Sequence, residues 1–234
     1  MVIDKIDVCI VSKTRVTGVK GLEYLPIGNL IIETSRPLGL ARMRAIQKVQ
    51  TEWFAFIDDD VEIDEGWFGA LTKYVQNDVG AVQGILQIKG LGEKWDNALN
   101  TTKISPSELK KGERGFTHNV LIRTKCVTDW KPSRSDLSAF EDYEISQHIL
   151  NKGYRWLRVP VESFHKLSWA KIWDNAIWAM QGWKKLYPSS RALAAKVLRC
   201  VTIILFLIAT ISAHPRANTV GIYQQSACLF GLLQ

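Results

Sequence analysis

The stretch Trp53–Asp60 reads Trp-Phe-Ala-Phe-Ile-Asp-Asp-Asp, in which five apolar residues run directly into three carboxylates. A continuous apolar run rich in aromatic side chains predicts a strand that is buried on both faces. The aspartates then stand at the carboxyl end of this strand, where open α/β sheets bind ligands. Such like charges need compensation, and Mg²⁺ or Mn²⁺ provides it through carboxylate oxygens. The alternative is a solvated acidic turn before a helix capped by Asp64.

Apolar runs elsewhere in the chain predict an alternation of strands and helices. Further strands are expected at residues 6–11, 30–33, 79–88, 120–122 and 156–161, and helices at 40–49, 65–77 and 140–151. The polar residues 90–116 and 129–138 are expected to form loops, the first of them long and mobile. This alternation through the first 165 residues predicts an α/β fold, with a mostly parallel sheet covered by helices on both faces.

The composition fits one α/β domain with an appendage, since the chain has 234 residues of which 47% are hydrophobic. The net charge of +7 is regional, because residues 152–199 hold ten Lys and Arg against two acidic residues. This excess indicates an anionic surface near the C-terminal third, although no nucleic-acid-binding motif is present. The four cysteines form no Cys-x-x-Cys pair, so a zinc site is not expected. The N-terminus has no signal-peptide character.

Several polar residues outside the aspartate triplet are candidates for a binding site. Arg42 lies near the start of the helix at 40–49, where a positive charge opposes the helix dipole and an anionic ligand such as phosphate would compensate it. Solvated arginine is the equal alternative. Glu141 and Asp142 open the helix at 140–151, where the dipole alone favours acidic residues. His165 follows the last expected strand.

The order of these features resembles glycosyltransferase family 2, whose members bind nucleotide sugars with a GT-A fold. The resemblance covers about residues 5–168. It rests on an ordered series of motifs: Gly39-Leu40-Ala41-Arg42, Phe56-Ile57-Asp58-Asp59-Asp60-Val61, Glu141-Asp142, Gly153-Tyr154-Arg155 and His165. The Asp-x-Asp pattern by itself is weak, whereas the series at family-like spacing is fairly specific.

The resemblance implies a Rossmann-like GT-A catalytic domain over residues 1–168. It implies that the Asp-x-Asp residues hold the donor ribose and a Mg²⁺ or Mn²⁺ ion on the donor diphosphate. It further implies a base that deprotonates the acceptor, as in inverting members. The expected positions are Asp142, with Glu141 beside it, for the base; Asp58, Asp60 and His165 for the metal; and Glu33, Arg42, Asp58 and Asp59 for the nucleotide-sugar donor.

The chain also departs from the family pattern. The segment between its first two strands is short where members have a helix, and the Gln-x-x-Arg-Trp motif of polymerising members is absent. The resemblance therefore implies a metal-dependent, inverting hexosyltransferase that transfers one sugar to a lipid-linked or glycan acceptor. A nucleotidyltransferase on a similar α/β fold is an alternative, because it would also use paired aspartates and a metal. A non-enzymatic membrane scaffold that keeps the fold is another.

The C-terminal third favours a membrane partner. Residues 168–187 predict an amphipathic helix that carries tryptophans on one face, and basic residues follow it. The alternative is that this face packs on the catalytic domain. The uncharged run Cys200–Ala213 falls short of the roughly 20 residues that span a bilayer. Residues 169–234 are therefore expected to form an amphipathic helix and a membrane-associated tail that either spans or lies on the bilayer. The basic flank predicts a cytoplasmic catalytic domain.

Overall fold

The computed structural model describes residues 3–12, 19–93, 96, 100 and 105–186. They fall into two compact units, one made of residues 1–87 and 103–165 and the other of residues 88–102 and 166–234. The first unit holds most of the regular elements. In chain order the elements are β1 (Ile6–Val11), η1 (Leu22–Tyr24), β2 (Ile27–Glu33), α1 (Leu38–Lys48), β3 (Trp53–Ile57), β4 (Val61–Glu62), α2 (Trp67–Thr72), β5 (Val79–Lys89), β6 (Ser107–Glu108), β7 (Asn119–Arg123), η2 (Thr124–Cys126), α4 (Glu141–Asn151), β8 (Arg155–Lys166) and α5 (Trp169–Leu186).

The strands form one sheet in the order β2-β1-β3-β7-β5-β8-β4, and β6 pairs with β8 off this path. Strand β1 pairs in parallel with both β2 and β3. Beyond β3 the direction changes, because β7 runs antiparallel to both β3 and β5, and β4 and β6 run antiparallel to β8. The predicted α/β class is confirmed, and the parallel pairing is concentrated at the β2-β1-β3 edge.

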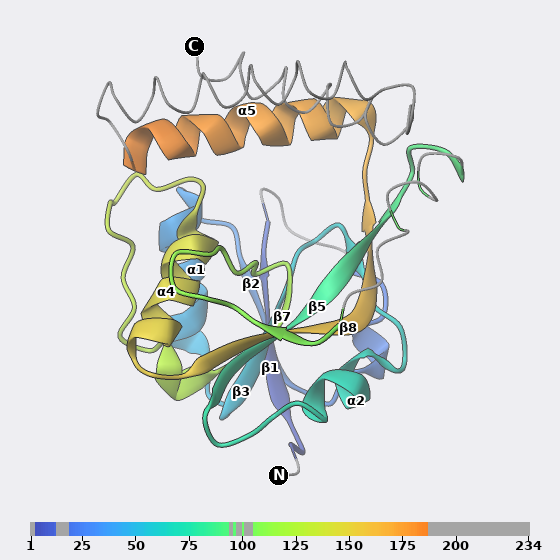
Figure 1. Ribbon diagram of the computed structural model, residues 1–234, viewed down its shortest axis with the longest axis vertical. Helices are drawn as coiled ribbons and strands as arrows, with labels where there is room; N and C mark the ends of the chain where they lie inside the picture. Colours follow the sequence, from blue (N-terminus) through green and yellow to red (C-terminus); the bar gives the residue numbers. More distant parts are fainter. Residues whose placement is uncertain (1–2, 13–18, 94–95, 97–99, 101–104, 187–234) are drawn as a thin grey trace. The chain divides into compact units, whose positions relative to one another are not determined.

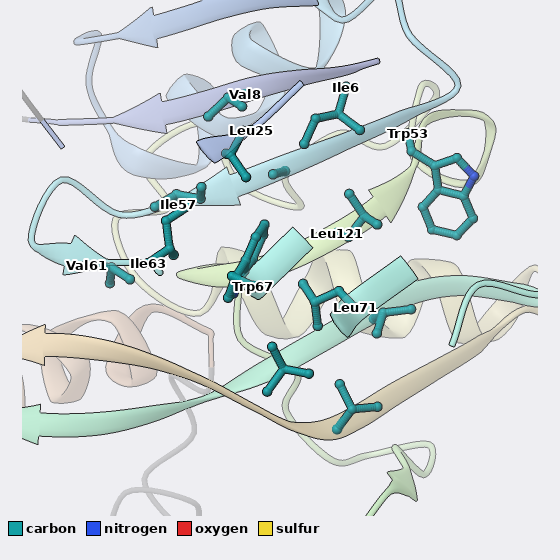
Figure 2. Close-up of a cluster of buried hydrophobic side chains, with 14 of the residues drawn as sticks. Ile6, Val8, Leu25, Trp53, Ile57, Val61, Ile63, Trp67, Leu71 and Leu121 are labelled. Carbon is teal, nitrogen blue, oxygen red and sulfur yellow. The ribbon is translucent and has the colours of Figure 1, made fainter. Parts of the chain in front are cut away.

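The buried strand β3 separates two cores, as its continuous apolar run predicts. Trp53, Ala55 and Ile57 pack in a cluster with α2, which Figure 2 shows around Trp67 and Leu71. The alternating Phe54 and Phe56 pack in a second cluster with α1 and α4. Figure 1 shows α1 and α4 on one side of the sheet and α2 on the other. Helices therefore cover both faces, as expected.

Two elements differ in length from the sequence expectation. Helix α2 ends at Thr72, well short of residue 77, because the chain continues in tighter turns, in which the N–H groups of Tyr74 and Val75 donate to the carbonyls of Leu71 and Thr72 at 3.0 and 3.1 Å. Strand β8 continues to Lys166 because its second half pairs with β4, where Val61 lies opposite His165. His165 is therefore inside a strand and not after one.

The expected loop at 90–116 is partly ordered. Strand β6 pairs Ser107 with Arg158 of β8. In the other unit, the carboxylate of Asp96 accepts the backbone N–H groups of Gly90 and Leu91 at 3.0 and 3.1 Å. The prediction of a long mobile loop is therefore wrong for these positions, because side-chain carboxylates and strand pairing satisfy the backbone.

Helix α5 matches the expected amphipathic helix, since Ile172, Ala176 and Met180 are buried along one side while Trp178 is 38% exposed. Within the described residues, no helix combines the length and apolar character that crossing a bilayer requires. The predicted apolar tail, including Cys200–Ala213, lies outside the described residues.

Candidate active site

The three carboxylates that follow β3 point to three different partners. Asp58 accepts a hydrogen bond from Arg42 at 2.8 Å, Asp59 accepts one from the Ser12 hydroxyl, and Asp60 pairs with the His165 ring at 3.0 Å. A backbone hydrogen bond of 3.1 Å from Val61 to Asp58 closes the turn that spreads them. The repulsion expected within the triplet is thus relieved by separate polar contacts.

Arg42 joins the aspartate turn to the start of α4. Its side chain is almost fully buried, and its guanidinium lies 4.5 Å from the centre of the Phe56 ring. Besides Asp58 it faces Glu141, whose Oε1 is 3.7 Å from its Nε. This helix-start arginine was predicted to meet an anionic donor, and in the structure carboxylates surround it. A buried guanidinium needs such partners, so the site is built around it.

Glu141 is a buried carboxyl with incomplete pairing. The residue before it, Phe140, is in the left-handed region with φ of 68°, which turns the chain into α4. The Glu141 side chain is 4% exposed, and its Oε2 has no hydrogen-bond partner among the described residues. Burial raises the pKa of Glu141 to about 8, the charge of Asp142 adds to the rise, and Arg42 opposes it. Such a group favours the neutral form at neutral pH.

Asp142, the predicted base, is held by an arginine that the sequence analysis did not single out. Nε of Arg114 lies 2.9 and 3.0 Å from the two carboxylate oxygens, and its Nη2 lies 2.8 Å from Oδ2. The Asp142 side chain is 7% exposed, and that of Arg114 is 29% exposed. The contact is a two-pronged arginine–carboxylate pair.

The pair of Asp60 and His165 is the best match to the predicted metal site. Among the described residues, no group of three or more His, Cys, Asp or Glu side chains is arranged to hold a metal ion. Asp58, expected in the same cluster, is turned toward Arg42. A carboxylate and an imidazole still fit an ion that takes its other ligands from a substrate, because Mg²⁺ is often held by one or two side chains plus phosphate oxygens.

His118 is a second residue that sequence reasoning missed. It immediately precedes β7, and its carbonyl accepts the Asp58 backbone N–H at 3.2 Å. Its ring stacks on Phe116 with 5.2 Å between centroids. Burial lowers the pKa of His118 to about 4, although the nearby charges of Asp58 and Asp142 act in the opposite direction. A neutral imidazole therefore lies within electrostatic reach of both acidic groups.

Glu33, which is predicted to contact the nucleotide base of the sugar donor, is the last residue of β2. Its carboxylate accepts hydrogen bonds from Lys48 at 2.7 Å and from the Ser35 backbone at 3.0 Å. Burial alone would raise the pKa of Glu33, but these hydrogen bonds outweigh it and lower the pKa to about 2. The two donors, Lys48 and Ser35, are not among the residues predicted to form the site.

A comparison with known protein families supports the resemblance that the motifs suggest. Residues 23–129 match a family model described as Glycosyl transferase family 2. The matched segment is similar to glycosyltransferases of family 2, the family that the ordered motifs also resemble. The match contains Asp58–Asp60 and ends before Asp142, so the role of that carboxylate stays a prediction.

Two of the solved structures that are similar to the chain each cover more than two thirds of it. One is the crystal structure of A197 from STIV, with 17% identity, a TM-score of 0.47, and coverage of 71% of this chain and 87% of that one. The other is the crystal structure of S. aureus TarS 1-349, with 12% identity, a TM-score of 0.49, and coverage of 96% and 90%. No curated protein sequence matches the chain significantly.

Proposed function

We propose that this protein is a metal-dependent, inverting glycosyltransferase that transfers one hexose from a nucleotide sugar to an acceptor hydroxyl. The observation that carries the proposal is the meeting of two acidic groups around one buried arginine. Arg42 is 2.8 Å from Asp58 at the end of β3 and 3.7 Å from Glu141 at the start of α4. The match to a glycosyltransferase family supports sugar transfer in general.

The proposed reaction is a single displacement at the anomeric carbon. The acceptor hydroxyl passes its proton to Asp142, and its oxygen forms a bond to the anomeric carbon. The bond from that carbon to the diphosphate breaks at the same time, and the nucleoside diphosphate leaves with the electron pair. One displacement inverts the anomeric configuration. An alcohol is a weak nucleophile that needs a positioned base, and the departing charge needs separate stabilisation. Asp142 at the start of α4 is proposed for the first task, and Asp60 after β3 for the second, through a bound cation.

A divalent cation is part of the proposal. Asp60 and His165 are the residues that would hold Mg²⁺ or Mn²⁺, since their side chains lie 3.0 Å apart and both are partly exposed. When bound, the ion acts as a Lewis acid toward the leaving diphosphate. Asp58 and Asp59, engaged by Arg42 and Ser12, are proposed to contact the donor sugar nucleotide, as is Glu33.

A donor screen tests this function directly. Thermal melting of the full chain is measured with a panel of nucleotide sugars, in Mn²⁺ or Mg²⁺ and in EDTA. We expect one donor to raise the melting temperature only when the ion is present. Products are then analysed: a free nucleoside diphosphate means sugar transfer, and pyrophosphate means nucleotidyl transfer. A chain that neither binds any donor nor turns one over would contradict the proposal and favour a scaffold.

We also propose that residues 169–234 attach the enzyme to the cytoplasmic face of a membrane, where a lipid-linked acceptor would be available. The support in the described residues is α5, with a tryptophan-rich sequence and with Lys184 and Lys185 in its last turn. The test is flotation with anionic and neutral vesicles, comparing the full chain with a chain lacking residues 189–234. We expect the full chain to float, more strongly with anionic lipid, and the shortened chain, which keeps α5, to bind only weakly and only at low salt. A full chain that stays soluble without detergent and never floats would refute membrane attachment.

A further inference from the structure

The carboxylate of Asp142 has little hydrogen-bonding capacity left over. An ionised carboxylate offers about four lone-pair sites. Oδ1 accepts from Arg114 Nε at 2.9 Å and from the Tyr143 backbone N–H at 2.8 Å. Oδ2 is 2.8 Å from Arg114 Nη2, and its 3.0 Å approach to Nε is the second branch of a shared hydrogen bond. Arg114 and the Tyr143 N–H therefore fix the plane of the Asp142 carboxylate.

Arg114 is itself held in place from two sides. Its guanidinium lies 4.4 Å from the centre of the Phe140 ring and 5.1 Å from that of Phe116. Phe140 directly precedes α4, the helix that carries Asp142. Asp142 and its partner Arg114 are thus both held at the start of α4. The contact with the two phenylalanine rings restricts the guanidinium of Arg114.

The backbone that carries Arg114 is docked on α4. We call residues 112–116, between β6 and β7, the 112–116 loop. Gln147 accepts the Gly112 N–H at 2.9 Å and donates to the Glu113 carbonyl at 2.7 Å. The Gly115 N–H donates to the Ser146 hydroxyl at 3.1 Å. A Cβ at Gly115 would lie 2.7 Å from the Trp156 ring, so only glycine allows this approach.

We propose that Arg114 is the positioning residue for the acceptor base: it holds the Asp142 carboxylate in the orientation in which it takes the proton of the acceptor hydroxyl. This inference rests on the proposed function. The competing role is a structural ion pair that only ties the 112–116 loop to α4. The two roles separate cleanly, because Gln147 ties the same loop to the same helix without touching Asp142.

The test uses the full chain and the donor found in the screen, with water or a glycan acceptor, and measures release of the nucleoside diphosphate. We expect Arg114→Ala to lower kcat about 100-fold, since a misplaced catalytic group costs rate on that order, with the donor KM changed less than about twofold. Arg114→Lys should recover little, because an ammonium cannot make the two-pronged contact. Added guanidinium ion at non-denaturing concentration should restore part of the Arg114→Ala rate. Gln147→Ala should keep kcat within about threefold of wild type.

A double variant completes the experiment. In an Asp142→Asn background, the small residual rate of nucleoside diphosphate release, followed at high enzyme concentration, should not fall further with Arg114→Ala, because residues that act as one unit are non-additive. The inference is overturned if Arg114→Ala keeps near-normal kcat, if Gln147→Ala loses as much, or if the two single losses multiply. A chain that transfers no sugar from any donor overturns the proposed function as well, whereas a chain that does, and is indifferent to Arg114, overturns this inference alone.

Discussion

Glu141 should make the stability of the fold fall as the pH rises through neutrality. The pKa of this carboxyl is raised by burial from 4.5 to about 8 in the folded chain. Between these values the folded state holds more protons than the unfolded state, so the free energy of unfolding decreases with pH. The stabilising contribution is complete below pH 4.5 and is lost as the pH rises through about 8.

His118 acts with the opposite sign in a lower interval. Burial lowers its pKa from 6.5 to about 4, so the folded state holds fewer protons there and stability rises with pH until about 6.5. Burial also raises the pKa of the Cys9 thiol above 9.0, which affects only alkaline solution. The interval from pH 6.5 to 8 therefore isolates Glu141 among the described groups with shifted pKa values.

The magnitude follows from the number of bound protons, which differs by about one between the folded and the unfolded chain. Each pH unit is worth about 1.4 kcal/mol, which gives about 2 kcal/mol over this interval, and Glu141 is too buried for solvent screening to reduce it much. For a chain of this size that corresponds to a melting temperature lower by about 4–8 °C. Glu141→Gln keeps the shape without the titration and should melt at a constant temperature across the interval.

The assay is thermal melting at fixed ionic strength, supported by urea unfolding at both ends of the interval. The exposed Glu65→Gln is the matched control and should follow the wild type. A wild-type melting temperature that is flat or rising from pH 6.5 to 8, or a Glu141→Gln variant with the wild-type slope, would refute the reasoning.

Three further substitutions test the proposed roles. Asp60→Ala should abolish the Mn²⁺-dependent rise in melting temperature that the donor produces, and unchanged metal-dependent donor binding would count against the predicted metal pair. Asp142→Asn should remove turnover while sparing donor binding, because a base acts on the acceptor proton. A variant with near-normal kcat would show that Asp142 only starts helix α4 and is not the base. Asp7→Ala should cost about 3 kcal/mol in urea unfolding, because the buried carboxylate accepts backbone N–H groups of Asn29 and Gln50 that would lose their partner. The exposed Asp4→Ala is its control, and equal stability of the two variants would contradict the estimate.

The sequence could predict the elements whose residues are packed on both faces. The run before Asp58 becomes β3 because the side chains on each face enter a core of their own. The sequence also pointed to the acidic residues at the end of β3 and the start of α4, since such clusters need compensation. What compensates Arg42 was not predictable, because its partners Asp58 and Glu141 come from elements far apart in the chain.

The residues that were missed share one cause, the direction of β7. In a parallel sheet the ligand-binding edge collects residues that follow strands, so an expected parallel sheet places residues that precede a strand at the opposite edge. Because β7 is antiparallel to β3, Asn119 lies opposite Ile57. His118 and the 112–116 loop with Arg114 are thereby brought to the edge where the aspartates stand. Short apolar runs such as Val120–Ile122 carry no signal of strand direction, so pairing alone could reveal these residues.

The same pairing imposes an order on biosynthesis. A chain made from its N-terminus presents β1, β2 and β3 first, and these can join as a parallel trio. The other edge of β3, a strand whose five residues are all buried in the folded chain, then stays unpaired until β7 has been synthesised. An unpaired apolar strand edge is a template for association with other chains. We therefore expect the nascent chain to be prone to aggregation between the synthesis of Ile57 and that of Arg123, while this edge of β3 has no partner.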